Sequence, residues 1–247
     1  MIAGKVKCRG VGNWHLNFDI CLDFDDSVFH RHTVQKILLA NMALELFYQT
    51  EIIEAGCDEA GRGCYAGPVF AAAVVLPNNF HHPLLNDSKQ VKEKDRNELR
   101  LFIEQNALSY AVGMVDNNEI DSINILRASF KAMHLALDKL QQQPALLLID
   151  GNRFTPYKKI PHHCIVEGDG KYASIAAASI LAKTYRDEYM QQLHLEFDMY
   201  GWNTNKGYGT ATHRQAIEAF GLCKYHRRSF NIVPKQIDLF VSQEVVV

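Results

Sequence analysis

Four acidic residues lie beside glycines in three short segments of the chain. "CDEAGRG" contains the adjacent Asp58 and Glu59, "LLLIDG" ends its apolar run at Asp150, and "EGDGK" contains Asp169. Grouped carboxylates repel one another and are costly to bury unpaired, and a divalent cation removes that conflict. Oxygen ligands without cysteine or histidine at ligand spacing favour magnesium or manganese. The four acids are therefore candidate metal ligands.

Such a site suits the hydrolysis of a phosphodiester. Two divalent ions about 3.5–4 Å apart can clamp the attacking and leaving oxygens of that bond. Each acid also has a plainer interpretation as a solvated loop residue or a helix cap, which for Asp169 is a full alternative. Asp58 and Glu59 would point to opposite faces of a regular strand. We therefore expect the strand to end there and the backbone to bend at the glycines.

A sheet must position these acids, because strand and helix patterns alternate from about residue 42. The expected strands cover residues 51–58, 68–77, 108–116, 145–150 and 162–168. The expected helices cover residues 91–107, 124–143 and 172–197, and the last has a core stripe of Ile175, Ala178, Ala182, Tyr185 and Tyr189. This order predicts an α/β fold with a mixed sheet flanked by helices. The acids follow strands at the edge where open α/β sheets bind ligands.

The composition is that of one large domain or two small ones. The chain has 247 residues, 47% of them hydrophobic, and a formal net charge of -2, which argues against a uniformly basic protein but not against a local basic patch. Its six cysteines include no Cys-x-x-Cys, so neither a structural zinc site nor a disulfide framework is expected. We expect a reducing, cytoplasmic compartment. No apolar run reaches the ~20 residues that span a bilayer, so no membrane partner is expected.

Five motifs of the chain occur in the order found in a known enzyme family. They are "GCDEAGRGCYAGPVFAAAVVLP", "LNDSKQ", "LLLIDGN", "EGDGKYASIAAASILAKTYRD" and "NKGYGTATH". Over about residues 50 to 232 the chain resembles bacterial ribonuclease HII. The resemblance implies a ribonuclease H-like α/β fold with a small C-terminal helical part. It also implies an endonuclease that cleaves RNA in RNA–DNA hybrids and cuts on the 5′ side of ribonucleotides embedded in duplex DNA, leaving 3′-hydroxyl and 5′-phosphate ends.

The resemblance assigns roles to the acids and to the glycines beside them. Asp58, Glu59, Asp150 and Asp169 match the family's catalytic, metal-binding acids, which implies two Mn²⁺ or Mg²⁺ ions in the active complex. The backbone of residues 61–63, which are Gly61, Arg62 and Gly63, would pack against the nucleotide that carries the 2′-hydroxyl. Side chains would block that approach, which would explain the glycines. Arg62 has an alternative as a phosphate or carboxylate contact without a reading role.

Two further residues match family positions near the nucleic acid. Tyr208, between two glycines, would pack on the deoxyribose that follows the ribonucleotide and so sense the RNA-to-DNA junction. Lys89, in "DSK", lies at a family position close to the substrate. Asp187 is interpreted as a structural residue that pairs with a neighbouring base, and His213 is assigned no catalytic role.

A basic stretch with interleaved aromatic residues follows near the C-terminus. Its basic residues are Lys206, Arg214, Lys224, Arg227 and Arg228. This composition suits contact with a phosphate backbone. A solvated helix face is the alternative.

Pattern and resemblance together divide the chain into three parts. Residues 1–41 are expected to be an extension outside the fold, with a small appended module as the alternative. Residues 42–232 form the expected ribonuclease H-like catalytic domain with its C-terminal helical part. Residues 233–247 form an expected flexible tail, and we expect a monomer.

The tail contains "QIDLF", which resembles the peptide by which bacterial replication proteins dock on the DNA polymerase sliding clamp. Leu239 and Phe240 would enter an apolar pocket while Gln236 makes a polar anchor. Packing of the same side chains on the body of the protein is the alternative.

Two other classes of function remain as alternatives. A non-catalytic hybrid-binding protein would have no use for negative charge gathered near phosphates, which argues against that class. A phosphate-cradling loop at "GRGCYAG" lacks the Lys-Ser/Thr of a P-loop and the spacing of a dinucleotide-binding motif. Magnesium-dependent cleavage would separate the enzyme from the binding protein.

Overall fold

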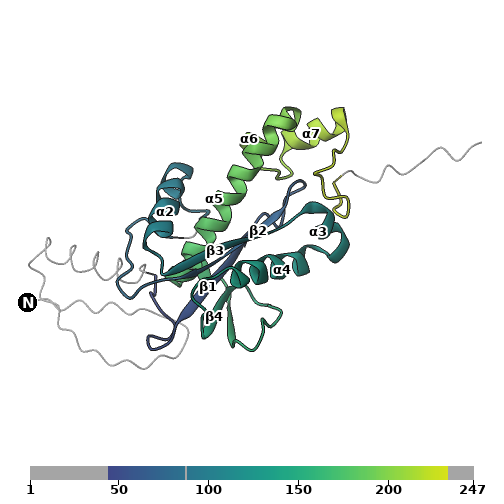
Figure 1. Ribbon diagram of the computed structural model, residues 1–247. Helices are drawn as coiled ribbons and strands as arrows, with labels where there is room; N and C mark the ends of the chain where they lie inside the picture. The colour runs from purple at the N-terminus through teal and green to yellow at the C-terminus, as the bar shows by residue number, and fades with distance from the viewer. Residues whose placement is uncertain (1–43, 87, 233–247) are drawn as a thin grey trace, which may run out of the picture. The chain divides into compact units, whose positions relative to one another are not determined.

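The computed structural model describes residues 44–86 and 88–232. The expectations for residues 1–41 and for the tail, with Gln236, Leu239 and Phe240, lie outside this part. In the described part a five-stranded sheet is flanked by helices, as the sequence predicts (Figure 1). The strands are β1 (Glu54–Ala60), β2 (Val69–Val75), β3 (Ser109–Val115), β4 (Leu146–Asp150) and β5 (His162–Ile165).

β1 lies at the centre of the sheet, whose strand order is β3-β2-β1-β4-β5. It pairs antiparallel with β2 and parallel with β4, so the sheet is mixed. The antiparallel ladder continues to Ala60, whereas the last parallel pair is Cys57 opposite Ile149. The expectation that the strand ends at Asp58 is therefore wrong. Hydrogen bonds to β2 keep the main chain extended through both acids, and only the side that faces β4 opens.

Helices cover both faces of the sheet. They are α2 (Glu93–Asn106), α3 (Asn117–Ile123), α4 (Ile125–Asp138), α5 (Ala173–Glu196), α6 (Trp202–Asn205) and α7 (Ala211–Phe220), with 3₁₀ turns η1 (Gly168–Gly170) and η2 (Asp198–Tyr200). α2 and α5 pack on one face and α4 on the other (Figure 1). Along β2, Ala71 and Ala73 face α4 while Ala72 and Val74 face α5, as the two-residue period of a strand requires.

Two glycines let helices approach the sheet at backbone distance. A Cβ atom on Gly56 of β1 would lie 2.2 Å from the carbonyl carbon of Ser174 in α5. A Cβ atom on Gly113 of β3 would lie 2.1 Å from the carbonyl oxygen of Ala132 in α4. No side chain fits at either place, so α5 lies directly against the strand that carries Asp58.

Every predicted strand and helix has a counterpart in the structure, with boundaries that differ by a few residues. The structure also contains one helix that the sequence did not predict, α3. Its polar sequence "NNEIDSI" has too few apolar residues to show a helical period, and the helix is fixed instead by the Asp116 side chain, which accepts a hydrogen bond from the Glu119 N–H. In the stripe predicted on α5, Tyr185 and Tyr189 are half-buried rather than fully buried.

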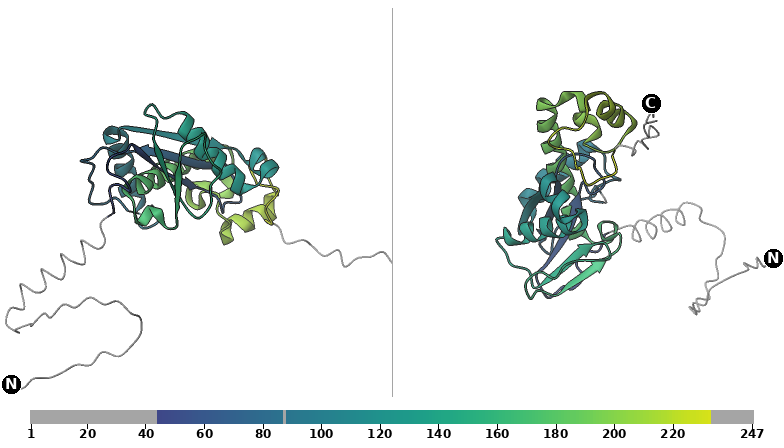
Figure 2. Two further views of the ribbon diagram at one scale, coloured as in Figure 1. Left: turned by 90° about the horizontal axis from the view of Figure 1, so that it is seen from below. Right: turned by 90° about the vertical axis from the view of Figure 1, so that its right-hand side faces the viewer.

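The small C-terminal helical part packs at the end of α5, in agreement with the prediction. α6 and α7 lie beside the C-terminal end of α5 in all three views (Figures 1 and 2). The fully buried Trp202 anchors this part, with Tyr200 stacked on it at 5.1 Å between ring centroids. Across residues 44–86 and 88–232, no helix is both long and apolar enough to cross a membrane.

Candidate active site

The four predicted acids are delivered by β1, β4 and η1. Asp58 and Asp169 are each 5% exposed, and Asp150 ends β4 at the margin of the core. The Asp150 Oδ1 atom accepts a hydrogen bond from the Gly168 N–H at 2.8 Å. This bond ties the end of β4 to the turn that carries Asp169.

Asp58 and Glu59 leave β1 on opposite faces of the sheet. Asp58 lies on the α5 side, where the Ser179 hydroxyl interacts favourably with its carboxylate and lowers its pKa. Glu59 lies on the α4 side. Both carboxylates nevertheless interact with the negative charge of Asp150. Because the pairing with β4 stops just before these residues, the site wraps around the end of β4 instead of occupying one face.

Burial and mutual repulsion raise the pKa values of the acids on β1. The pKa of Asp58 lies well above its usual range, chiefly because the carboxyl is buried and then because Glu59 and Asp150 repel its charge. The pKa of Glu59 is also raised by burial, and the guanidinium of Arg62 opposes that shift. A divalent cation would relieve both causes, because it supplies positive charge where water is excluded.

Basic side chains partner the carboxylates as they stand. Arg62 donates to Glu59 at 3.0 Å, and the Lys89 ammonium lies 3.9 Å from Asp169. Lys89 also interacts with the charge of Glu59, so it spans the site. Among the described residues no three Asp, Glu, His or Cys side chains are arranged to hold a metal ion together. Donors that are all carboxylate oxygens fit Mg²⁺ or Mn²⁺, but bringing them onto an ion requires these basic side chains to move.

The two glycines of the loop after β1 differ in what surrounds them. A Cβ atom on Gly61 would lie 2.0 Å from Nε of Arg186, and the residue has a φ of +97°. Gly63 has no atom within 4 Å of such a Cβ, and its φ is not positive. The protein's own packing is thus sufficient reason for glycine at position 61, and the proposed contact of the Gly61 main chain with a nucleotide stays a prediction. The contact expected at Gly63 also stays a prediction.

Two buried arginines hold this loop from beneath. Arg227 donates to the carbonyl oxygens of Gly61 at 2.7 Å and of Arg62 at 2.8 Å, and Arg186 donates to that of Pro68 at 3.0 Å. Both are 0% exposed, and burial lowers the pKa of Arg227 to about 10. The prediction that Arg227 belongs to a basic stripe on the surface is therefore wrong. A basic residue looks the same in sequence whether it meets phosphates or backbone carbonyls.

Lys206 also departs from the predicted basic stripe, since it is 7% exposed. Arg214, Lys224 and Arg228 are exposed. Only these three remain available to a phosphate backbone.

Tyr208 lies beside the loop after β1. Its side chain is 39% exposed, and the residue forms an isolated antiparallel bridge with Cys64. The Lys183 ammonium and the Arg186 guanidinium lie 5.6 Å and 5.7 Å from its ring centroid. The ring is backed by two cations and open to solvent, and its packing on a sugar of the substrate stays a prediction.

Known proteins share this arrangement of sequence and fold. A model of the family described as Ribonuclease HII matches residues 55–233. Ribonuclease HII of Parabacteroides distasonis is 60% identical over 193 residues, which cover 78% of this chain and 97% of that protein. Ribonuclease HII of Bacteroides fragilis is 61% identical over 191 residues, covering 77% and 95%. The chain belongs to the ribonuclease HII family. It is accordingly a hydrolase, an endonuclease with ribonuclease H activity on RNA–DNA hybrids.

Solved structures agree with the fold of this ribonuclease HII family member. Ribonuclease H2 from Pyrococcus horikoshii has a TM-score of 0.61 at 25% identity, covering 72% of this chain and 94% of that one. The RNase HII in a PCNA complex from Archaeoglobus fulgidus has a TM-score of 0.60 at 23% identity, covering 76% and 100%. Bst-RNase HIII in complex with Mn²⁺ has a TM-score of 0.59 at 20% identity, covering 79% and 70%.

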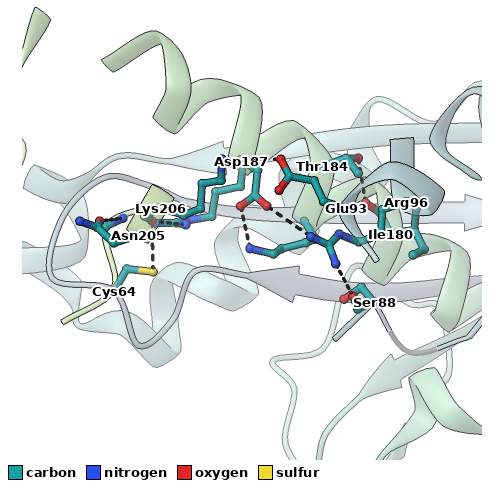
Figure 3. A network of polar contacts seen from close by, with 12 residues as sticks. Cys64, Ser88, Glu93, Arg96, Ile180, Thr184, Asp187, Asn205 and Lys206 are labelled. Carbon is teal, nitrogen blue, oxygen red and sulfur yellow. Dashed lines mark hydrogen bonds and ion pairs between the residues drawn. The ribbon is translucent and has the colours of Figure 1, made fainter. Parts of the chain in front are cut away.

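Asp187 has the structural role that the sequence analysis gave it. Its carboxylate accepts from Lys183 at 2.7 Å and lies 4.0 Å from the Arg96 guanidinium, which also bonds to the carbonyl oxygen of Ser88 (Figure 3). Arg96 and Asp187 also line a cavity of about 270 Å³ between α2 and α5. None of the four predicted metal-binding acids lines this cavity, so it is not the site of the chemistry.

Stability below neutral pH is expected to depend on His226 of this ribonuclease HII. Burial lowers its pKa from 6.5 to about 4. As pH falls from 6.5 to 4, the unfolded chain takes up a proton that the folded chain refuses, so the free energy of unfolding decreases by up to about 3 kcal/mol. Urea titrations of the wild type and of His226→Gln across this range should show a shallower decline for the variant. Equal slopes of the free energy of unfolding against pH in the two proteins would contradict the prediction. The raised pKa values of Asp58 and Glu59 stabilise the folded state as pH falls, but they do so in both proteins.

Proposed function

We propose that this ribonuclease HII cuts a duplex on the 5′ side of a ribonucleotide, leaving 3′-hydroxyl and 5′-phosphate ends. The observation that carries the proposal is the gathering of Asp58, which is buried, with Glu59 and Asp150 around the end of β4, where their negative charges repel one another. Asp169 joins them through the bond between Asp150 and Gly168. A protein that only bound nucleic acid would gain nothing from negative charge at this place.

We propose that the four acids hold two divalent ions. The relative Bst-RNase HIII was solved in complex with Mn²⁺, which supports a divalent cation for this chain. When bound, such ions would activate water and neutralise charge on the phosphate. The chain's own contribution is to gather the carboxylates at the end of β4. It also supplies Arg62 and Lys89 as cations beside the site.

The substrate is proposed to reach the acids across the loop after β1. Gly63 is open on its Cβ side, and Tyr208 lies next to this loop through its bridge to Cys64. A nucleotide that lies over Gly63 can expose its 2′-hydroxyl to main-chain groups, and the next sugar can lie on Tyr208. Both residues would then contribute to the choice of an RNA-to-DNA junction.

A duplex DNA that contains one ribonucleotide and a 5′ label tests the proposal directly. We expect a single cut on the 5′ side of the ribonucleotide with Mg²⁺ or Mn²⁺, and no cut with EDTA or on all-DNA duplex. Binding without any cut under these conditions would favour the alternative of a hybrid-binding protein. Cutting of long RNA–DNA hybrids alone would leave the family activity and remove the junction proposal.

If the substrate passes over Gly63, the Gly63→Ala variant should fold normally but cleave poorly. The added methyl group would contact no protein atom, and the φ of residue 63 is not positive. The melting temperature should therefore stay within about 1–2 °C of the wild type. Cleavage of the single-ribonucleotide duplex should fall at least about tenfold, because the methyl group lies where the nucleotide is proposed to pack. Unchanged kcat/KM in this folded variant would show that the nucleotide does not pass over Gly63.

A partner is proposed for the tail. The Archaeoglobus fulgidus relative was solved in complex with PCNA, which supports a clamp interaction for this chain through Gln236, Leu239 and Phe240. We expect removal of residues 236–247 to abolish capture of the protein by an immobilised bacterial sliding clamp while leaving cleavage unchanged. Equal capture of the shortened protein would remove this proposal.

A further inference from the structure

A buried pair of histidines connects the C-terminal helical part to Tyr208. His213 is 0% exposed and His226 is 1% exposed, and their Nε2 atoms lie 3.2 Å apart. The Nδ1 atom of His213 lies 2.9 Å from the carbonyl oxygen of Tyr208. The Trp202 Nε1–H donates to His213 Nε2 at 3.1 Å. The chain of contacts thus runs from α6 and the segment after α7 to the main chain of Tyr208.

The outer groups of this network fix where each proton lies. The Cys223 N–H can only donate, so His226 Nδ1 accepts from it at 3.0 Å, and His226 Nε2 carries the proton. That proton is donated to His213 Nε2, which also accepts from Trp202. His213 Nδ1 therefore carries the remaining proton and donates it to Tyr208. With both rings neutral, His213 Nε2 shares its one lone pair between the donors of Trp202 and His226, and any other tautomer would oppose two donors or two acceptors.

The main chain at Tyr208 needs such an anchor. Tyr208 stands between Gly207, with a φ of +83°, and Gly209, so its neighbours restrict its backbone little. The Tyr208 N–H donates to the carbonyl oxygen of Asn205, and its carbonyl oxygen accepts from the Thr210 N–H. The bond from His213 is the contact that ties this carbonyl oxygen to a rigid, buried aromatic cluster.

We propose that His213 is a positioning residue for Tyr208, with His226, itself oriented by the Cys223 N–H, holding its imidazole in the required tautomer. By fixing the Tyr208 carbonyl oxygen, His213 sets the direction in which the exposed ring meets the sugar of the substrate. The inference rests on the proposed contact between Tyr208 and an RNA-to-DNA junction. It assigns to a buried residue, which touches no substrate, a part in the choice of cleavage site.

Two substitutions at His213 separate positioning from packing, because each retains half of its hydrogen bonds. The glutamine carboxamide of His213→Gln reaches the position of Nε2 and can still accept from Trp202 and His226, but the donor to Tyr208 is lost. The asparagine carboxamide of His213→Asn reaches the position of Nδ1 and can still donate to Tyr208, but the buried donors of the cluster lose their acceptor. Packing alone predicts that Asn is the more harmful change; positioning predicts that Gln is.

The measured quantity is the ratio of kcat/KM for a duplex with one ribonucleotide to kcat/KM for a uniform RNA–DNA hybrid. We expect His213→Gln to lower this ratio at least fivefold at a near-normal melting temperature. His213→Asn should lower the melting temperature and leave the ratio within twofold of the wild type. Trp202→Phe, which disturbs the same cluster without touching Tyr208, should also leave the ratio unchanged. A wild type that cuts no junction substrate would instead refute the proposed function.

A double-mutant cycle with Tyr208→Ala completes the test. If His213 acts through Tyr208, adding His213→Gln to Tyr208→Ala should change the ratio less than twofold further. Multiplying effects in the double variant, or a ratio unchanged in folded His213→Gln, would overturn the proposal. Should His213→Gln fail to fold, a lowered ratio in His213→Asn together with Trp202→Phe would equally overturn it, since both keep the donor to Tyr208.

Discussion

An Asp150→Asn variant should cleave the single-ribonucleotide duplex at least about a thousandfold more slowly than the wild type, which corresponds to about 4 kcal/mol of transition-state stabilisation. Asp150 is the acid whose charge reaches both Asp58 and Glu59. Asparagine can still accept the hydrogen bond from Gly168, so the end of β4 and η1 should stay in place. The loss is expected in kcat, measured in single-turnover reactions with Mg²⁺ and with Mn²⁺.

Asp138→Asn is the matched control for that experiment. It removes the same charge from the exposed end of α4, where Asp138 pairs with Lys158 at 3.0 Å. Its cleavage rate should equal that of the wild type. Substrate binding by Asp150→Asn should be retained, because removing a negative charge near phosphates does not weaken their attraction to the protein. Cleavage within tenfold of normal by Asp150→Asn would refute the assignment of the metal-binding acids.

Gly56→Ala should destabilise the fold by more than about 3 kcal/mol, the upper end of the usual range for overpacking. The new methyl group would lie 2.2 Å from the carbonyl carbon of Ser174 and 2.4 Å from the nitrogen of Ile175. These are main-chain atoms of α5, so no side-chain rotation can relieve the collision. The helix would have to move away from β1 and take Ser179 away from Asp58. Urea unfolding followed by circular dichroism measures the change in free energy.

Gly170→Ala is the corresponding control for stability. A Cβ atom at Gly170 meets nothing within 4 Å, and the residue has no positive φ. The free energy of unfolding should therefore change by less than about 0.5 kcal/mol. A cost at Gly56 as small as this would mean that α5 does not rest on β1 at main-chain distance.

The sequence predicts the frame of the sheet well, for reasons that lie in individual segments. "ALLLID" is apolar at every position because β4 is buried on both faces, and "PVFAAAVV" is so for the same reason. The acids at the ends of such strands could be identified because polar residues there interrupt an otherwise continuous apolar run. Helix α5 was equally clear, since its length and its small residues leave few alternatives.

What the sequence did not predict depends on contacts between distant residues. Arg186 and Arg227 meet the carbonyl oxygens of the loop after β1 across more than a hundred residues of chain, and no local pattern marks a buried arginine. Gly61 leaves room for the Arg186 side chain, so this reason for the glycine could not be predicted without knowing that Arg186 is buried there. The pairing of His213 with His226 follows from the way the segment after α7 returns to α6.

The central place of β1 in the sheet has a consequence for the newly made protein. β1 reaches β2 across residues 61–68 but reaches β4 only across residues 61–145, and closing the longer loop costs more chain entropy. We expect β1, β2 and β3 to gain protection from hydrogen exchange before β4 in pulse-labelled refolding. The site would then stay incomplete until Asp150 and Asp169 fold with the second half of the chain. A nascent chain still on the ribosome, surrounded by RNA, would therefore carry only half of its cutting centre, and nuclease activity would appear only after synthesis has passed α5.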